Sequence, residues 1–313
     1  MHASDALMSP PVALGAGLIS ITLIAVASRR VKTQQRSDII PLMGVMGAFV
    51  FAAQMINFSI PGTGSSGHLI GGILLSAILG PWAAFIALSS IIIVQALFFA
   101  DGGIMALGCN ILNMAATSCL IAYPFIFKPL VGNKVKPWRI ALASILASVV
   151  ALEIGALGVT VETELSGVTA LPFATFIKFM LPIHLVIGCV EGLVTASLLI
   201  FLASYRPGLL GFTNSDNKNS KKIKPLLIGT GIATLILAGG FTYLASENPD
   251  GLEWSLEKVS GIADWPSFTP DTAFMPDYDS QFAGIIGAII VMALVWGLSS
   301  LIFAQIRRAS KDK

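Results

Sequence analysis

The chain has 313 residues, of which 55% are hydrophobic and only 12% are charged, with a net charge of +2 and a mean hydropathy of +0.83. A soluble domain carries about 25% charged residues, so this composition excludes an ordinary soluble protein and indicates that lipid is the surrounding solvent. Its three cysteines, at positions 109, 119 and 189, all lie within apolar runs and predict neither a disulfide framework nor a metal site.

Nine apolar runs follow one another along the chain, at 11–28, 38–58, 68–80, 82–100, 104–127, 138–159, 172–203, 225–246 and 283–306. Most are long enough to cross a hydrocarbon core of about 30 Å as a helix. The third run is too short to cross, and it follows the glycine-rich stretch 61–67. Because non-helical backbone at membrane depth needs protein or water to satisfy its polar groups, we expect this stretch to turn inward and to line a cavity.

The basic residues predict the orientation. Nearly all Lys and Arg fall in four clusters, after the first, fifth, seventh and ninth runs. These turns lie on one side of the membrane, which the positive-inside rule assigns to the cytoplasm. The N-terminus is therefore expected outside and the C-terminus inside. The first run has no positively charged segment before it, so we expect no cleaved signal peptide.

These features predict an all-α polytopic membrane protein with about nine transmembrane helices. We expect a seven-helix core over 1–205, a polar and basic cytoplasmic linker over 206–224, and a two-helix module over 225–313. The module encloses an acidic extracytoplasmic loop at 247–282. The expected location is the plasma (inner) membrane of a prokaryote, as a multi-pass protein in the lipid bilayer. No nucleic-acid partner is expected.

The first two residues carry a possible metal site. In Met1-His2 the α-amine, the His2 main-chain nitrogen and the His2 Nδ1 can reach one ion through a five-membered and a six-membered chelate ring. A square of nitrogen donors suits Ni²⁺ or Cu²⁺. His68 follows the glycine-rich stretch on the same outer side and is a candidate for the fourth donor. Two interpretations remain open at this point, because His68 could instead cap the short third helix while His2 is disordered.

Several motifs resemble the CbiM/NikM family, over about 1–205. They are MHASDALMSP (1–10), QMINFSIPG (54–62) with SGHLIGG (66–72), DGG (101–103) with ALGCN (106–110), and HLVIG (184–188) with EG (191–192). The family comprises substrate-binding components of energy-coupling-factor (ECF) nickel and cobalt transporters. The resemblance implies that Met1, His2 and His68 bind Ni²⁺ or Co²⁺ as the transported substrate. The chain departs from the usual family start at positions 3, 4 and 6, and its glycine-rich loop is one residue longer.

A second resemblance lies in the C-terminal module. The segment NPDGLE (248–253) is similar to the PDGLE motif of the small accessory component of these transporters, here fused to the main one. This fused arrangement resembles nickel systems more than cobalt systems.

Other polar residues within or beside the apolar runs could support such a site. Asp5, Asn57, Asn110 and Asn113, together with Gln54 and Gln95, are candidates to orient the metal-binding groups. His184 and Glu191 lie seven residues apart on one helix face. They could relay protons or gate the cavity, or they could hold helices together.

No GxxxxGK[ST] phosphate loop is present, so the chain is expected to be a transporter subunit and not an enzyme. The resemblance implies that partners supply the energy: a transmembrane coupling (T) subunit and ATPase subunits. Two rivals remain. One is a proton-coupled secondary metal transporter that uses His184 and Glu191. The other is a rhomboid-like intramembrane serine protease, because 64–67 reads GSSG and would pair Ser66 with His184.

Overall fold

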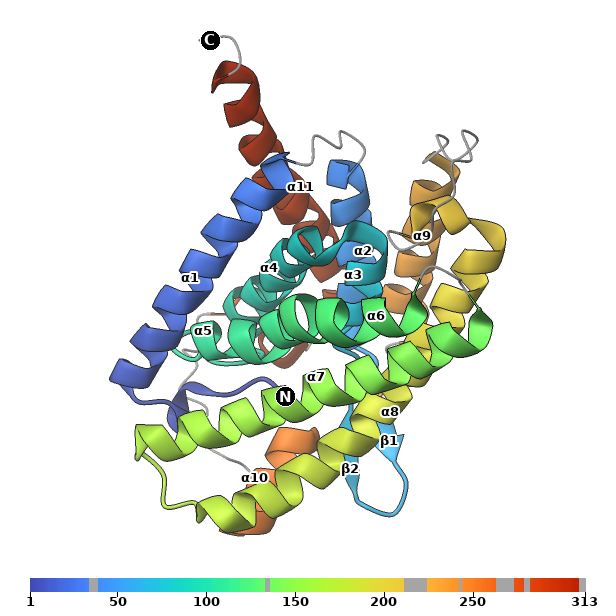
Figure 1. The fold of residues 1–313 in the computed structure, drawn as a ribbon. Coiled ribbons are helices and arrows are strands. Elements are labelled where there is room, and N and C mark those ends of the chain that lie inside the picture. The colour runs from blue at the N-terminus through green and yellow to red at the C-terminus, as the bar shows by residue number, and fades with distance from the viewer. Residues whose placement is uncertain are drawn as a thin grey trace.

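The computed structural model describes residues 1–33, 39–132, 136–210, 224–241, 244–262, 273–278 and 282–309. Helices dominate this part of the chain (Figure 1). The core helices are α1 (Pro10–Thr33), α2 (Ile39–Gln54), α3 (Gly72–Leu79), α4 (Pro81–Phe99), α5 (Leu107–Asn110), α6 (Lys128–Val131), α7 (Pro137–Ser166) and α8 (Phe173–Tyr205). A π-helical segment, Ile111–Phe127, joins α5 to α6. The C-terminal helices are α9 (Lys224–Ile236), α10 (Gly251–Ser260) and α11 (Ala283–Ala309).

Each of the nine expected apolar runs contains a helix, although some ends differ. The second helix ends at Gln54 and not at 58, because a turn and the first strand of a hairpin follow it. The third begins at Gly72, four residues after the predicted start, and is only eight residues long. The prediction of a short third helix after non-helical backbone is therefore confirmed.

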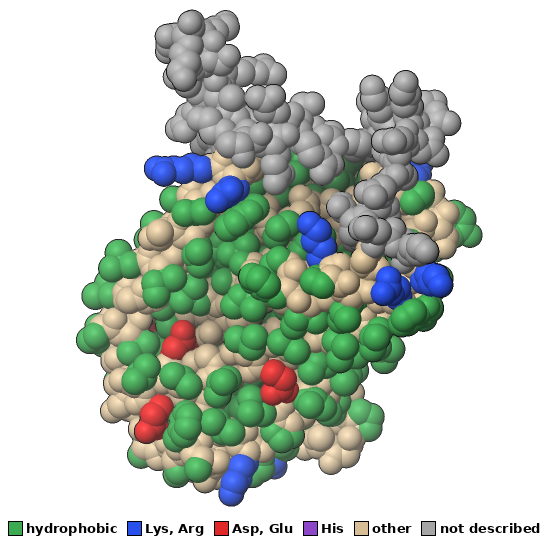
Figure 2. All heavy atoms as spheres, viewed as in Figure 1, with side chains coloured by type: hydrophobic (Ala, Val, Ile, Leu, Met, Phe, Trp, Pro, Cys, Tyr) green, Lys and Arg blue, Asp and Glu red, His purple; other side chains and the backbone are tan. Residues whose placement is uncertain are grey.

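Five helices are long and apolar enough to cross a membrane: Pro10–Val31, Pro81–Phe99, Leu107–Val131, Pro137–Ser166 and Phe173–Tyr205. Their outward faces carry large apolar side chains, such as Leu18 at 67% exposure and Phe125 at 74%. Figure 2 shows this apolar surface, with Lys and Arg side chains gathered mainly towards its upper end. Exposed apolar surface of this extent marks a contact with lipid or with other proteins, and together with the five apolar helices it points to a multi-pass membrane protein.

The glycine-rich stretch forms a small antiparallel hairpin. Strand β1 (Phe58–Ile60) pairs with β2 (Ser65–Gly67). Gly62 and Gly64 adopt positive φ angles of 79° and 75° between the strands, a conformation that only glycine accepts readily. Strand β2 is fully buried. The prediction that this stretch turns inward is confirmed for its second strand.

The C-terminal module packs directly on the core. Helix α11 lies against α2 and α4, α9 lies against α2, and α10 lies against α8 and β2. Gly44 of α2 allows a close approach, since a Cβ there would lie 3.3 Å from the Met292 carbonyl of α11. Most of the predicted linker, residues 211–223, lies outside the described residues. The described parts of the predicted acidic loop contain α10 and a short helical turn, Pro276–Tyr278.

Candidate metal site

The N-terminal segment is folded into the protein and not disordered. The Asn110 side chain binds both main-chain groups of Ala3: its Oδ1 accepts from the Ala3 N–H at 2.8 Å and its Nδ2 donates to the Ala3 carbonyl at 3.1 Å. The Gly103 N–H also donates to that carbonyl, at 2.9 Å. Asn110 therefore fixes the main chain at Ala3, next to His2.

Asp5 fixes the segment a second time. Its Oδ1 accepts from the Ala106 N–H at 2.9 Å, just before α5 begins. The buried side chains of Leu7 and Met8 then anchor the turn that leads to α1. The departures from the usual family start at positions 3, 4 and 6 are thus compatible with a docked N-terminus.

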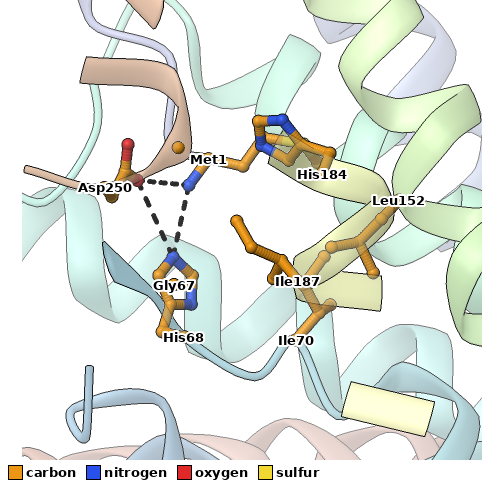
Figure 3. Close-up of a pocket in the computed structure, with 9 residues that line it drawn as sticks. Met1, Gly67, His68, Ile70, Leu152, His184, Ile187 and Asp250 are labelled. Atoms are coloured by element: carbon orange, nitrogen blue, oxygen red, sulfur yellow. Dashed lines mark hydrogen bonds and ion pairs between the residues drawn. The ribbon is translucent and has the colours of Figure 1, made fainter. Parts of the chain in front are cut away.

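Docking brings the first nitrogen of the chain into a buried polar cluster. The Met1 amine lies 3.2 Å from His68 Nε2 and 2.5 Å from Asp250 Oδ2. His68 Nε2 and Asp250 Oδ2 are 4.0 Å apart, which closes a triangle (Figure 3). Met1 is only 4% exposed. The predicted pairing of the amine with His68 is present in the structure.

Burial and mutual contact set the charge states of the groups in this triangle. Burial, and then the nearby Met1 ammonium, lower the pKa of His68 to about 3, so its imidazole is neutral at physiological pH. Burial alone would raise the pKa of Asp250, but the Met1 ammonium and His68 hold it well below its usual range. A neutral imidazole and a carboxylate therefore flank the Met1 ammonium.

His2 is placed differently from the prediction. Its ring stacks on that of His68 with centroids 5.4 Å apart. Its Nδ1 lies 3.0 Å from Asp101 Oδ1, and its Nε2 lies 3.2 Å from Gln95 Oε1. The Nδ1 is thus engaged by a carboxylate and is not aimed at the amine. To form the six-membered chelate ring, the imidazole must turn and leave Asp101.

A buried carboxylate of α8 fixes the backbone of the loop that carries His68. Glu191 of α8 accepts from the Ile70 N–H at 2.9 Å and from the Gly71 N–H at 3.0 Å. Gln54 Nε2 donates to the Ile70 carbonyl at 2.9 Å. Glu191 therefore contacts the backbone of the loop that carries His68, a role closer to the packing interpretation than to a proton relay.

A small cavity opens beside the triangle. It is lined by Met1, Gly67, His68, Ile70, Leu152, His184, Ile187, Asp250 and Gly251. The volume open to the centre of a water-sized sphere is about 10 Å³, which is room for roughly one water molecule or ion. The predicted cavity next to the glycine-rich loop is therefore present.

Two other predicted supporting residues have contacts away from the histidines. Asn113 Nδ2 donates to Glu162 at 2.6 Å, and the main-chain carbonyl of Asn57 accepts from the Ser246 N–H. Two acidic residues of the site were not predicted, Asp101 and Asp250. Both belong to motifs, DGG and PDGLE, that indicate a family resemblance but do not reveal what their carboxylates contact.

The structure gives no support to the serine-protease rival. Ser66 is fully buried, and its hydroxyl donates to the Asn248 carbonyl at 2.8 Å. His184 Nδ1 lies 2.7 Å from the Met180 carbonyl of its own helix. Each residue is thus paired with main-chain oxygen.

Among the described residues, no group of three His, Cys, Asp or Glu side chains is arranged to hold a metal ion. The candidate site has a different composition, since it combines a terminal amine, a main-chain nitrogen and imidazoles.

Comparison with known proteins agrees with this architecture. The model for the cobalt uptake substrate-specific transmembrane region (CbiM) matches residues 2–209, and the PDGLE domain model matches residues 224–304. The fused nickel transport protein NikMN of Rhodobacter capsulatus is 27% identical over 99% of this chain and 100% of its own length. A protein of Haloquadratum walsbyi named as a metal transport protein is 34% identical over 70% of this chain and 97% of its own.

Solved structures are similar as well. The crystal structure of a transition metal transporter superposes with a TM-score of 0.58 at 29% identity, covering 72% of this chain and 99% of that one. A truncated form gives 0.57 at 31% identity and covers 66% of this chain. On these grounds, and with a docked N-terminus beside the PDGLE segment, the chain belongs to the CbiM family of metal transport proteins, fused to a PDGLE domain.

Proposed function

We propose that this chain is the substrate-specificity subunit of an ECF-type importer and captures Ni²⁺, or Co²⁺, on the outer side of the membrane. Its donors are the Met1 amine, the His2 main-chain nitrogen, the His2 imidazole and His68 Nε2. The single observation that carries the proposal is the buried Met1 amine, 3.2 Å from His68 Nε2. Nickel is favoured because four nitrogens suit a square-planar ion, and because relatives with the same fusion are named as nickel transport proteins.

Capture requires two exchanges within the site. The Met1 ammonium, which pairs with Asp250, and the His2 main-chain N–H must each release a proton to the solvent, because only the deprotonated nitrogens have a lone pair to give to the metal. The His2 imidazole must leave Asp101 and bring its Nδ1 to the ion. The two carboxylates stay within the cluster and offset the charge of the bound cation.

The remainder of the proposal concerns the assembly. We place the N-terminus outside, with nine spans in the inner membrane of a prokaryote, and assign ATP hydrolysis to partner subunits that bind through a transmembrane coupling subunit. The relation to nickel and cobalt transport proteins and the absence of a phosphate loop in the sequence support this division of labour.

Lengthening the chain by one residue before Met1 tests the proposal. The amine would become an amide, and the cavity has no room for another residue. We expect calorimetric Ni²⁺ binding to be lost, whereas the same residue added after Lys313 should leave the affinity within about twofold. Unchanged affinity in the extended protein would remove the basis of the proposed site.

A further inference from the structure

His184 of α8 is a buried imidazole with one unused nitrogen. The residue is 1% exposed, and its Nδ1 lies 2.7 Å from the Met180 carbonyl. Because a carbonyl only accepts, Nδ1 carries the proton and Nε2 bears a lone pair. This Nε2 is buried and has no hydrogen-bond partner among the residues that the structure describes.

This arrangement is the one found in metal-binding histidines. Such residues donate their second ring N–H to a main-chain carbonyl or a carboxylate, which fixes the tautomer and aims the other nitrogen at the ion. A buried polar atom without a partner is uncommon in native proteins and requires a reason. Ligation of a cation would supply one.

The place of His184 fits this reason. It lines the same cavity as Met1, His68 and Asp250, and that cavity holds roughly one ion (Figure 3). The α10 N-terminus closes over the ring: a Cβ on Gly251 would lie 3.3 Å from His184 Nε2. Glycine at 251 therefore keeps the nitrogen unobstructed next to Asp250.

We propose that His184 Nε2 is a fifth nitrogen ligand, in addition to the square of four, for the ion that the Met1 amine and His68 hold. This inference rests on the proposed function, since it concerns the same cation. It also assigns different roles to the two residues that the sequence placed on one helix face. Both oxygens of Glu191 accept hydrogen bonds from the Ile70 and Gly71 N–H groups of the His68 loop, whereas His184 lines the cavity proposed to hold the ion.

The chain has only three histidines, which permits a direct count. Full-length protein with its native N-terminus is labelled with ¹⁵N-histidine and titrated with Ni²⁺, and His184 is assigned by the loss of its signal in His184→Gln. We expect the Nε2 resonance of His184 to move or vanish with one equivalent of metal, together with signals of His2 and His68. Changes in His2 and His68 alone would overturn the inference and leave the proposed function intact. No change in any imidazole would contradict the proposed function itself.

Two variants give an independent readout. His184→Gln keeps a polar side chain and His184→Leu keeps an apolar one, but both lack the ring nitrogen. Each should weaken Ni²⁺ binding by about tenfold or more. Wild-type affinity in either folded variant would show that the nitrogen is not a ligand, and if neither variant folds, the count in the labelled wild-type protein decides.

Discussion

The Met1 amine and the Asp250 carboxylate lie 2.5 Å apart, although 249 positions separate them in the chain. Asp250 divides its two oxygens between two tasks. Oδ2 pairs with the ammonium, while Oδ1 caps α10 by accepting from the Leu252 and Glu253 N–H groups. The helix cap therefore aims the carboxylate, and the PDGLE segment becomes part of the wall of the candidate site.

Replacing this carboxylate should weaken cation binding. In Asp250→Asn the α10 cap is retained, because asparagine caps helices as well as aspartate does, but the negative charge beside the ion is lost. We expect the Ni²⁺ dissociation constant to rise by about tenfold, or about 1.4 kcal/mol, measured by calorimetry. Glu253→Gln is the matched control, since it changes the capping box but not the contact with the amine, and it should change affinity by less than about threefold. Equal losses in both variants would assign the effect to the helix and not to the charge.

Metal binding should release protons. The amine is an ammonium paired with Asp250 and must lose a proton to ligate, so affinity should rise with pH and bound metal should leave on acidification. His68 adds little to this dependence above about pH 3, because its pKa is lowered to about 3 by burial and by the ammonium. Calorimetry at pH 7 in buffers of different ionisation enthalpy should give at least one proton released per Ni²⁺. A value of zero would mean that the amine is not a ligand.

Glu191 should control the site through the His68 loop. In Glu191→Gln one N–H of the loop faces an amide group that cannot satisfy both partners, at a cost of about 1–3 kcal/mol in stability. We expect a lower unfolding temperature and about tenfold weaker Ni²⁺ binding. Cys189→Ser, on the same helix and half-buried, should change neither quantity. Full affinity in Glu191→Gln would show that the loop keeps its shape without the carboxylate.

Two glycine-to-alanine changes should separate docking of the N-terminus from general helix stability. A Cβ on Gly103 would collide with the Asp5 carboxylate, which anchors the segment that carries Met1 and His2. We expect Gly103→Ala to lose high-affinity Ni²⁺ binding in calorimetry. Gly15→Ala in α1 meets nothing within 4 Å and should be neutral or slightly stabilising. Normal Ni²⁺ binding by Gly103→Ala would show that the N-terminal segment can bind the metal without the close approach of Asp5 to position 103.

The positions of the helices follow from local sequence, and so does much of the site. Apolar runs locate the helices because the length of each run is set by the thickness of the membrane. Met1 and His2 could be proposed because chelate-ring geometry depends on covalent structure alone, and His68 because it follows the glycine-rich stretch on the same side and stands in a motif of the family. The end of α2 and the start of α3 differ from the predicted positions. The apolar pattern continues beyond them, but a hairpin follows α2 and a glycine with positive φ, Gly71, precedes α3.

Contacts between distant segments could not be predicted in the same way. Asp101 and Asp250 face His2 and Met1 only because of how the docked N-terminus and α10 pack, and no spacing in the sequence encodes either pair. The contact of Asn113 could not be predicted for a related reason. It lies three residues from Asn110, but the helix is π-helical from Ile111 onward, and its side chain turns to Glu162 on α7.

The double use of Asp250 has a consequence for biosynthesis. Met1 is the first residue to be synthesised, whereas Asp250, which pairs with its amine, is added only after most of the chain has been made. Until α10 is formed and capped, the ammonium lacks its counter-charge and the cavity lacks one wall. The pocket is therefore completed late, and metal binding at the proposed site would have to wait until the fused module has joined the core.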